Sequence, residues 1–375
     1  MRVAIVSESF LPQVNGVANS VRHVVDRLID TGHDPLVVAP APGPDQYRGV
    51  PVVRVRSLAL PGYKSFPLGL PDLSIGDALT DFRPDVMHLA SPIALGAIGL
   101  RYARKLDIPT VAVYQTDIAG FARQYRIRAD TAAAAWIGRI HRRSTRNLVP
   151  STASYHQLAS MGVTDIYRWG RGVNFDLFDP SNRSQEVHDS WTRRYETGEQ
   201  RTVIGFVGRL AAEKQVDRLI ELYNLPGTKL VVIGDGPERE DLERAMPNAV
   251  FPGMITGPRL AQAFASLDLF VHTGEHETFC QTIQEAQASG VAVVAPRAGG
   301  PIDLIDHGRT GLLYDHQRPG AFREVVAGVV ADPALRARIA AAGLANVQGR
   351  TWANVVDELI ETHYPAAIVR HAVAA

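Results

Sequence analysis

The stretch TVIGFVGRLAAEK, residues 202–214, decides the fold, because it restarts in mid-chain a pattern that first occurs at the N-terminus. An apolar run typical of a buried strand passes through a glycine turn into a segment with two cations. The earlier copy is the apolar run at 2–7, which leads through a loop to Gly16 at the start of a helix. Two starts of one strand-loop-helix pattern predict two domains.

Short apolar runs alternate with helical stretches after each start, which is typical of a parallel, doubly wound sheet. The first helix should bury one stripe formed by Val17, Val21, Val24 and Leu28. The expected strands lie at 2–7, 35–40, 52–55, 85–89, 110–114, 147–150, 202–207, 230–234, 250–252, 267–271 and 291–295. The sequence therefore predicts an α/β protein with two Rossmann-like domains whose parallel sheets face a central cleft.

The chain length of 375 residues suits two cores of middling size. We expect an N-terminal domain over 1–172 and a C-terminal domain over 173–350. Residues 351–375 should form a helix that crosses back to the first domain and ends in a loose tail from His371.

Composition excludes several classes of protein. The single cysteine, Cys280, allows no internal disulfide, favours a reducing compartment and is interpreted as a small core residue rather than a nucleophile. The N-terminus lacks an adequate signal-peptide core, and no run approaches the ~18 apolar residues of a membrane span. We therefore expect a cytoplasmic protein.

The zero net charge hides a division of the chain. Residues 1–170 hold 19 Lys and Arg against 13 Asp and Glu, whereas the remainder holds 20 against 26. The positive excess lies largely in Arg123, Arg126, Arg128, Arg139, Arg142, Arg143 and Arg146, interleaved with Phe121, Tyr125, Trp136 and Ile140. Such a segment docks on an anionic membrane surface, holds an acidic acceptor or is simply a solvated helix face. Nucleic acid is not expected, since no recognition motif accompanies the charge.

The stretch GEHETFCQTIQEAQASG, residues 274–290, carries two carboxylates beside a helix start. Thr278 and Gln281 fit a capping box, so the helix is expected over 279–289 with Glu277 outside it and Glu285 within it. Their separation of roughly 12 Å would let them grip opposite ends of a ligand. Backbone N–H groups at Phe279, Cys280 and Gln281 would face a phosphate between those ends. The alternative is a dipole-favoured acid and a solvated glutamate.

Other candidate residues follow strands, where open parallel sheets bind ligands. Asn15 and Gly16 stand at the mouth of the first helix, as a phosphate contact or as a plain turn. Arg209 and Lys214 follow the strand at 202–207 and suit a diphosphate, with Glu213 orienting Lys214 or pairing with it. A surface salt bridge is the alternative for this pair.

Three glycine-containing turns belong to the same rim, at 234–240, 252–257 and 298–300. Gly253, Met254 and Ile255 suit contacts to a nucleoside base, and the Ala-Gly-Gly turn suits a close approach of ligand. Ordinary turn chemistry is the alternative for all three.

Taken in order, Gly16, GRLAAEK and the Glu277/Glu285 pair make the whole chain resemble glycosyltransferase family 4, the retaining nucleotide-sugar transferases with the GT-B fold. Within it the sequence is most similar to actinobacterial GDP-mannose-dependent α-mannosyltransferases. The segment GVNFDLFDP at 172–180 is similar to the family's interdomain segment, with Asn174 where Asp is usual.

The resemblance implies that 1–172 is the acceptor-side domain and 173–350 the nucleotide-sugar donor domain, and it implies roles for these residues. Arg209, Lys214 and Gly16 would contact the donor's phosphates, Glu285 the ribose hydroxyls and Glu277 the hydroxyls of the transferred sugar. The backbone at 279–281 would contact sugar and phosphate. No metal is needed in the family, and the Arg/Lys pair is the physical substitute for Mg²⁺.

One departure from the family concerns the strand at 110–114. Many members carry a histidine after it that contacts an outer hydroxyl of the sugar, whereas this chain has Gln115, which hydrogen-bonds but does not titrate near neutral pH. Asp117 becomes a candidate carboxylate on the acceptor side, or a helix cap. His88 follows another strand and is either a ligand contact or, in our preferred interpretation, a core histidine.

The leading hypothesis is a peripheral enzyme that moves α-mannose from GDP-mannose to a lipid-linked acceptor at the cytoplasmic face of the membrane, in synthesis of cell-envelope glycolipids. A UDP-sugar donor is the nearest alternative. A GT-B isomerase or phosphorylase and an inactive nucleotide-sugar-binding protein are the others.

Overall fold

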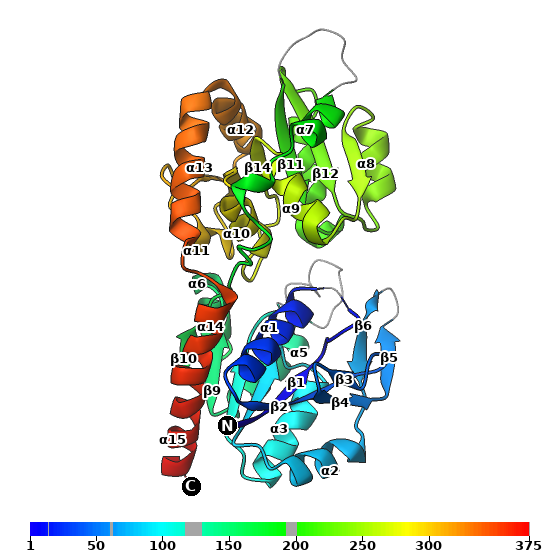
Figure 1. Ribbon diagram of the computed structural model, residues 1–375, viewed down its shortest axis with the longest axis vertical. Helices are drawn as coiled ribbons and strands as arrows, with labels where there is room; N and C mark the ends of the chain where they lie inside the picture. Colours follow the sequence, from blue (N-terminus) through cyan, green and yellow to red (C-terminus); the bar gives the residue numbers. More distant parts are fainter. Residues whose placement is uncertain (14, 61–62, 117–129, 193–200, 375) are drawn as a thin grey trace. The chain divides into compact units, whose positions relative to one another are not determined.

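The computed structural model describes residues 1–13, 15–60, 63–116, 130–192 and 201–374. The described chain divides into two compact units, Met1–Gly172 with Trp352–Ala375, and Val173–Thr351. Each contains a mainly parallel sheet with helices around it, as Figure 1 shows. Two parallel-sheet α/β domains are the predicted fold class.

The first unit is built on a sheet in the order β10-β9-β8-β7-β1-β2-β4-β3. Neighbouring strands pair in parallel except at the edge, where β3 runs antiparallel to β4, and β5 and β6 form a separate antiparallel hairpin. The strands are β1 (Arg2–Ser7), β2 (Asp34–Pro40), β3 (Gln46–Tyr47), β4 (Val50–Val55), β5 (Ser57–Leu60), β6 (Tyr63–Gly69), β7 (Val86–Ala90), β8 (Thr110–Val113), β9 (Arg146–Val149) and β10 (Ile166–Arg168).

Helices cover both faces of this sheet because successive strand residues point to opposite sides. In β1, Val3 and Ile5 enter one core with α1 and the C-terminal helices, whereas Ala4 and Val6 enter the other with α2 and α3. The helices are α1 (Gly16–Asp30), α2 (Leu73–Phe82), α3 (Leu95–Lys105), α5 (Asp130–His141), α6 (Thr152–Ser160), α14 (Trp352–Glu358), the π-helix η4 (Leu359–His363) and α15 (Tyr364–Ala374). The predicted α1 stripe is confirmed: its four residues are all buried.

The C-terminal helices are an integral part of the first unit. Tyr364 Oη lies 2.9 Å from His88 Nδ1 in the core, and Asp357 accepts two hydrogen bonds from Arg27. The prediction of a loose tail from His371 is wrong, because the helix continues to Ala374 and His371 Nε2 lies 2.9 Å from Asp107 Oδ1.

The second unit has the strand order β13-β12-β11-β14-β15-β16, which is the dinucleotide-fold order of 3-2-1-4-5-6, with every pairing parallel. Its strands are β11 (Thr202–Val207), β12 (Thr228–Ile233), β13 (Val250–Gly253), β14 (Leu269–Val271), β15 (Ala292–Pro296) and β16 (Leu312–Tyr314). Its helices are η1 (Pro180–Asn182), α7 (Gln185–Thr192), η2 (Ala212–Lys214), η3 (Val216–Leu222), α8 (Arg239–Ala245), α9 (Gly257–Ala265), α10 (Gln281–Ala288), α11 (Pro301–Leu304), α12 (Ala321–Ala331) and α13 (Pro333–Val347).

In both sheets the chain reverses its direction of winding beside the first strand of the unit. In the second unit, β11 lies between β12 and β14, and in the first unit β1 lies between β2 and β7. Loops that leave neighbouring strands on either side of this point diverge, which opens a crevice at the carboxyl ends of the strands. These loops are therefore the first places to look for a site.

Candidate functional site

The loops after β11 and β14 bring the second unit's charged candidates together. Lys214 ends the 3₁₀ helix η2 that follows β11, and Glu277 lies in the loop after β14. Lys214 Nζ donates to Glu277 Oε1 at 2.5 Å, and His272 Nε2 lies 3.2 Å from the same oxygen. A largely buried carboxylate, 14% exposed, thus faces two potential cations at the switch point of the sheet.

The electrostatics of this cluster favour charged side chains. Burial alone would raise the pKa of Glu277, but Lys214 and His272 hold it well below its usual range. Burial alone would lower the pKa of His272, yet the neighbouring Cys280 and Glu277 outweigh burial and raise it to about 9. Likewise, Glu277 outweighs burial and raises the pKa of Lys214. At neutral pH the cluster therefore holds an ionised carboxylate, an ammonium and an imidazolium.

Arg209 follows β11 as predicted but has a different partner from Lys214. Its Nη1 lies 3.6 Å from Glu213 Oε1, so Glu213 forms its ion pair with Arg209, and the carboxylate on Lys214 is Glu277. Arg209 and Lys214 are consequently held by two separate carboxylates of the same unit.

Close packing explains the glycines near this cluster. A Cβ at Gly274 would lie 3.1 Å from His272 Nε2 and 3.3 Å from Glu277 Oε1. A Cβ at Gly299 or Gly300 would lie 2.7 Å from Glu277 O or 2.3 Å from Phe279 O, respectively. The Ala-Gly-Gly turn therefore supports the Glu277 loop, to which Gly300 N donates at 2.7 Å. Our interpretation of that turn as an approach for ligand is not needed to explain its glycines.

The turn at 234–240 is explained in the same way. Gly234 and Gly236 have φ of 141° and 157°, and added Cβ atoms would meet Gly208 O and Leu210 O at 1.8 and 2.2 Å. Leu210 N also donates to Asp235 O at 2.9 Å. This turn thus buttresses the loop that carries Arg209.

The helix after Glu277 forms, but the predicted capping box is wrong. The helix α10 begins at Gln281, and its N-cap is Cys280 in the left-handed conformation, with φ of 78° and no side-chain cap hydrogen bond. Residues 278–280 are therefore not a first helical turn, because the left-handed residue separates Thr278 from the helix. Cys280 is 6% exposed and packs in the core, in line with its interpretation as a core residue.

Glu285 lies on α10, about one turn into the helix, and is partly exposed. Burial raises the pKa of its carboxyl to about 7. The cost of that burial is what an incoming hydrogen-bond donor would relieve.

The turn after β13 contains an exposed apolar side chain. Gly253 has φ of 80° and passes the chain to Met254, whose surface is 71% exposed, while Ile255 is partly buried. An exposed methionine at the carboxyl edge of the sheet is suited to contact with a flat apolar ligand group.

In the first unit, Asn15 and Gly16 form the capped start of α1. Asn15 Oδ1 accepts from Val17 N and Ala18 N at 3.0 and 2.9 Å, and its Nδ2 donates to Ser9 Oγ at 2.7 Å. The N–H of the exposed Gly16 is not among the groups that Asn15 caps. It lies at the positive end of a helix of 15 residues.

Gln115 is buried two residues after the end of β8, and its Oε1 accepts from Arg171 Nη2 at 2.7 Å. Asp117, the other candidate after this strand, lies outside the described residues. His88 is 1% exposed, and burial lowers its pKa to about 3, which agrees with a core histidine.

The Arg-rich segment is only partly described. Arg123, Arg126 and Arg128, with Phe121 and Tyr125, lie outside the described residues. The exposed members are Arg139, Arg142 and Arg143 near the end of α5, beside Trp136, which is 47% exposed. Arg146 does not belong to this surface, because it is 8% exposed, stacks on Tyr167 and donates to His363 Nδ1 at 3.1 Å.

Sequence reasoning missed three buried side chains at these edges. His272 directly follows β14 and Glu8 directly follows β1, so the rule that ligands bind after strands would have found both. Glu8 Oε1 accepts from Ile93 N and Gly96 N at 2.8 and 2.9 Å, and burial raises the pKa of its carboxyl. Arg171 carried no signal in the sequence.

One group of described residues has the composition of a metal site. Ligand atoms of His272, Glu277 and Cys280 lie within 4.8 Å of one another. The ammonium of Lys214 shares the same Glu277 oxygen, however, and would repel a metal ion there. This Glu277 oxygen is therefore already paired with an ammonium group.

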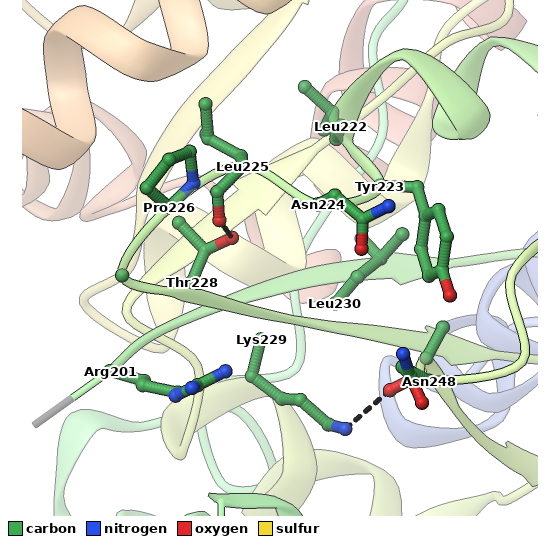
Figure 2. A pocket seen from close by; sticks show the side chains of 12 residues that line it. Arg201, Leu222, Tyr223, Asn224, Leu225, Pro226, Thr228, Lys229, Leu230 and Asn248 are labelled. Atoms are coloured by element: carbon green, nitrogen blue, oxygen red, sulfur yellow. Dashed lines mark hydrogen bonds between the residues drawn. The ribbon is translucent and has the colours of Figure 1, made fainter. Parts of the chain in front are cut away.

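A cavity elsewhere in the second unit is not part of this site. Figure 2 shows it lined by Arg201, Tyr223, Lys229 and Asn248, whose backbone oxygen accepts from Lys229 Nζ. These residues lie before or at the amino ends of β11, β12 and β13, the sheet edge opposite to Lys214 and Glu277.

Comparison with known proteins assigns the chain to a family. Residues 14–177 match the model for "Glycosyltransferase Family 4", and residues 188–345 match "Glycosyl transferases group 1". The chain is 49% identical to a GDP-mannose-dependent alpha-mannosyltransferase of Mycobacterium tuberculosis, over 98% of this chain and 97% of the relative. The chain belongs to glycosyltransferase family 4. The resemblance noted in the sequence is confirmed.

Two further comparisons concern the family and the fold, respectively. A GDP-mannose-dependent alpha-mannosyltransferase of Mycolicibacterium smegmatis is 48% identical over the full length of both chains. The solved structure of sucrose-phosphate synthase from Thermosynechococcus elongatus matches with a TM-score of 0.80 at 17% identity, over 97% of this chain and 98% of that one. The latter shows the fold, and the predicted GT-B class is confirmed.

Proposed function

We propose that this glycosyltransferase transfers α-mannose from GDP-mannose to a lipid-linked acceptor at the cytoplasmic face of the membrane. The observation that carries the donor assignment is the 49% identity, over nearly the whole of both chains, to a relative named for GDP-mannose. The paired charges after β11 and β14 support a diphosphate donor in general, and they do not choose between guanine and uracil.

In the proposed reaction, Arg209 and Lys214 bind the diphosphate of the donor. As the bond from the anomeric carbon to the phosphate oxygen breaks, negative charge grows on the leaving GDP, and these cations stabilise it. The acceptor oxygen bonds to the anomeric carbon from the same face, and its proton passes to an oxygen of the leaving phosphate. The configuration is retained, and no carboxylate needs to act as a nucleophile.

The remaining residues bind the donor in this proposal. Glu277 holds hydroxyls of the sugar, and Lys214 keeps that carboxylate ionised. Glu285 accepts from ribose hydroxyls, Met254 covers the base, and the Gly16 N–H contacts phosphate. The backbone of Gly253 and of 279–281 supplies further contacts. Gln115 contacts the sugar in place of the family's histidine.

We also propose that no metal takes part, because Arg209 and Lys214 supply the positive charge that Mg²⁺ provides elsewhere. Transfer measured with excess EDTA should match transfer without it. A rate restored only by added Mg²⁺ or Mn²⁺ would contradict this part of the proposal.

The lipid acceptor is supported by the exposed basic end of α5. Arg139 and Arg143 are exposed there beside the half-exposed Trp136, a combination suited to an anionic interface. Among the described residues, no helix is long and apolar enough to span a bilayer. Replacing Arg139, Arg142 and Arg143 by Gln should weaken binding to anionic vesicles at low salt and have little effect at high salt. Equal binding of the variant and the unmodified protein would make this a solvated face.

The decisive experiment measures transfer of labelled sugar into the organic-extractable fraction of bacterial membranes, with GDP-mannose and UDP-glucose in parallel. Label from GDP-mannose alone is the expected result. Label from UDP-glucose alone would favour the UDP-sugar alternative, and no label from either would favour an isomerase, a phosphorylase or a binding protein.

A further inference from the structure

One guanidinium ties together two loops of the first unit. Arg171 Nη1 donates to Gly16 O at 2.7 Å, and its Nη2 donates to Gln115 Oε1 at 2.7 Å. Arg171 and Gln115 are 8% and 6% exposed, so the bond between them forms away from bulk water. The three residues come from positions far apart in the chain and meet at the carboxyl edge of the sheet.

The chemistry of arginine decides how the Gln115 amide is oriented. A glutamine amide has an acceptor end and a donor end of nearly the same shape, and a half-turn exchanges them. A guanidinium carries donors only, so it accepts nothing from the NH₂ end and selects the carbonyl. Arg171 therefore keeps Oε1 toward itself and turns Nε2 away.

We propose that Arg171 is a positioning residue that fixes the Gln115 amide so that it meets the transferred sugar as a hydrogen-bond donor. The proposal rests on the proposed function for the sugar contact of Gln115. The second bond, to Gly16 O, holds the start of α1 with the same side chain. The donor group at 115 and the helix end at Gly16 are thereby set by one residue.

Gln115→Glu separates this role from a structural one. A glutamate keeps the size of the side chain and pairs even more strongly with Arg171, but it offers the ligand an oxygen where the amide offered N–H groups. A purely structural contact would tolerate this change. A contact that orients a donor would not.

The kinetic experiment compares the unmodified protein with Gln115→Glu, Gln115→Ala, Arg171→Met and the double variant Arg171→Met/Gln115→Ala. Gln115→Glu should keep the melting temperature but lose roughly 10- to 100-fold in kcat/KM for GDP-mannose, while binding GDP as before. Arg171→Met should lose a similar factor, and the double variant should lose much less than the product of the two single losses. Retained activity in Gln115→Glu, or a double-variant loss equal to the product of the single losses, would overturn the proposal. Arg171→Lys reaches one partner only, so its kcat/KM should lie between those of the unmodified protein and Arg171→Met. It replaces Arg171→Met in the comparison if that variant does not fold.

A second measurement does not depend on catalysis. In protein labelled with ¹⁵N-glutamine, the NH₂ signals of Gln115 are assigned by their absence in Gln115→Ala. Arg171→Met, or Arg171→Lys, should speed their exchange with solvent roughly tenfold or more, because the amide is then free to turn. Unchanged signals would overturn the clamp whatever the activity. Faster exchange in the Arg171 variant, together with no mannose transfer by the unmodified protein, would instead leave the clamp standing and reject the proposed function.

Discussion

The two units place different chemistry at equivalent edges of similar sheets. In the second unit the loops after β11 and β14 carry Lys214, His272 and Glu277, which hold one another in charged forms. In the first unit the loops after β1 and β8 present the neutral amides of Asn15 and Gln115, each fixed by hydrogen bonds. Both folds provide a similar carboxyl edge of the sheet. The residues in the loops determine whether that edge would bind a ligand through charged groups or through oriented amide dipoles.

The histidines sharpen the contrast. Among the described residues of the first unit, every histidine with a shifted pKa is shifted downward by burial, and the strongest case is His88. In the second unit the pKa of His272 is shifted upward. Response to pH near neutrality should therefore originate at the second unit's edge.

Lys214→Ala tests that edge most severely. We expect a loss of about 10³-fold in kcat/KM, because the variant removes a cation from the leaving group and leaves the largely buried Glu277 with one partner fewer. Initial rates with GDP-mannose measure the loss. Arg244→Ala is the matched control, since its side chain is 75% exposed in a surface ion pair, and it should retain activity. A Lys214→Ala enzyme within threefold of the unmodified rate would remove the charge-based half of the comparison.

His272→Gln should flatten the dependence of stability on pH. A folded pKa of about 9, above the unfolded value near 6.5, contributes stability that is complete below about pH 6.5 and is lost as pH rises toward 9. The free energy of unfolding should therefore fall by up to about 3 kcal/mol more in the unmodified protein than in the variant across that window. Urea titrations at pH 6, 7, 8 and 9 measure it. His88→Gln should leave that window unchanged, because a lowered pKa acts only as pH falls below about 6.5. Parallel curves for the unmodified protein and His272→Gln would refute the assignment.

The carboxyl of Glu285 has a pKa raised to about 7. Donor binding should therefore strengthen as pH rises, whereas the stability contributed by His272 is lost as pH rises. Only the ionised form accepts from both ribose hydroxyls, so the affinity for GDP should rise about tenfold between pH 6 and pH 8. Glu285→Gln should bind more weakly at pH 8 and show no such rise. Calorimetric titration of GDP into both proteins measures this, and a rise of equal size in the variant would exclude Glu285 as its source.

Met254→Ala should have the smallest effect of these variants. Losing apolar cover over the base should weaken GDP binding by roughly threefold without changing the melting temperature, because the side chain is exposed. Ile220→Ala, at a 44% exposed position of the same unit, should leave GDP affinity unchanged. Equal affinity of Met254→Ala and the unmodified protein would argue against contact with the base.

The sequence was sufficient to predict the position of the central strands but not that of the strands at the sheet edges. The runs at 2–7 and 202–207 are buried and strongly apolar, and both strands have the predicted bounds. The edge strands β10 and β16 have three residues each and no distinctive pattern, and the β5–β6 hairpin departs from the parallel scheme. Whether such a short segment becomes a strand depends on its pairing with a neighbouring strand, and a single sequence does not show that pairing.

At the candidate site, residue types were easier to predict than partners. Lys214 and Glu277 were singled out, but their mutual contact comes from two loops 63 positions apart. The capping box failed because local spacing does not reveal that Cys280 is left-handed. Arg146 was counted with surface charge, although the fold stacks it on Tyr167. Tertiary packing overrides local rules in each case.

The path of the chain has a consequence for synthesis. Val173–Thr351 is one continuous stretch inserted into the other unit, whose final helices, from Trp352 onward, arrive last. On the ribosome, the unit that starts first is therefore the one that is finished last, and its sheet waits for Tyr364 to cover His88. The inserted unit has all of its sequence earlier and is able to close while its host is still incomplete.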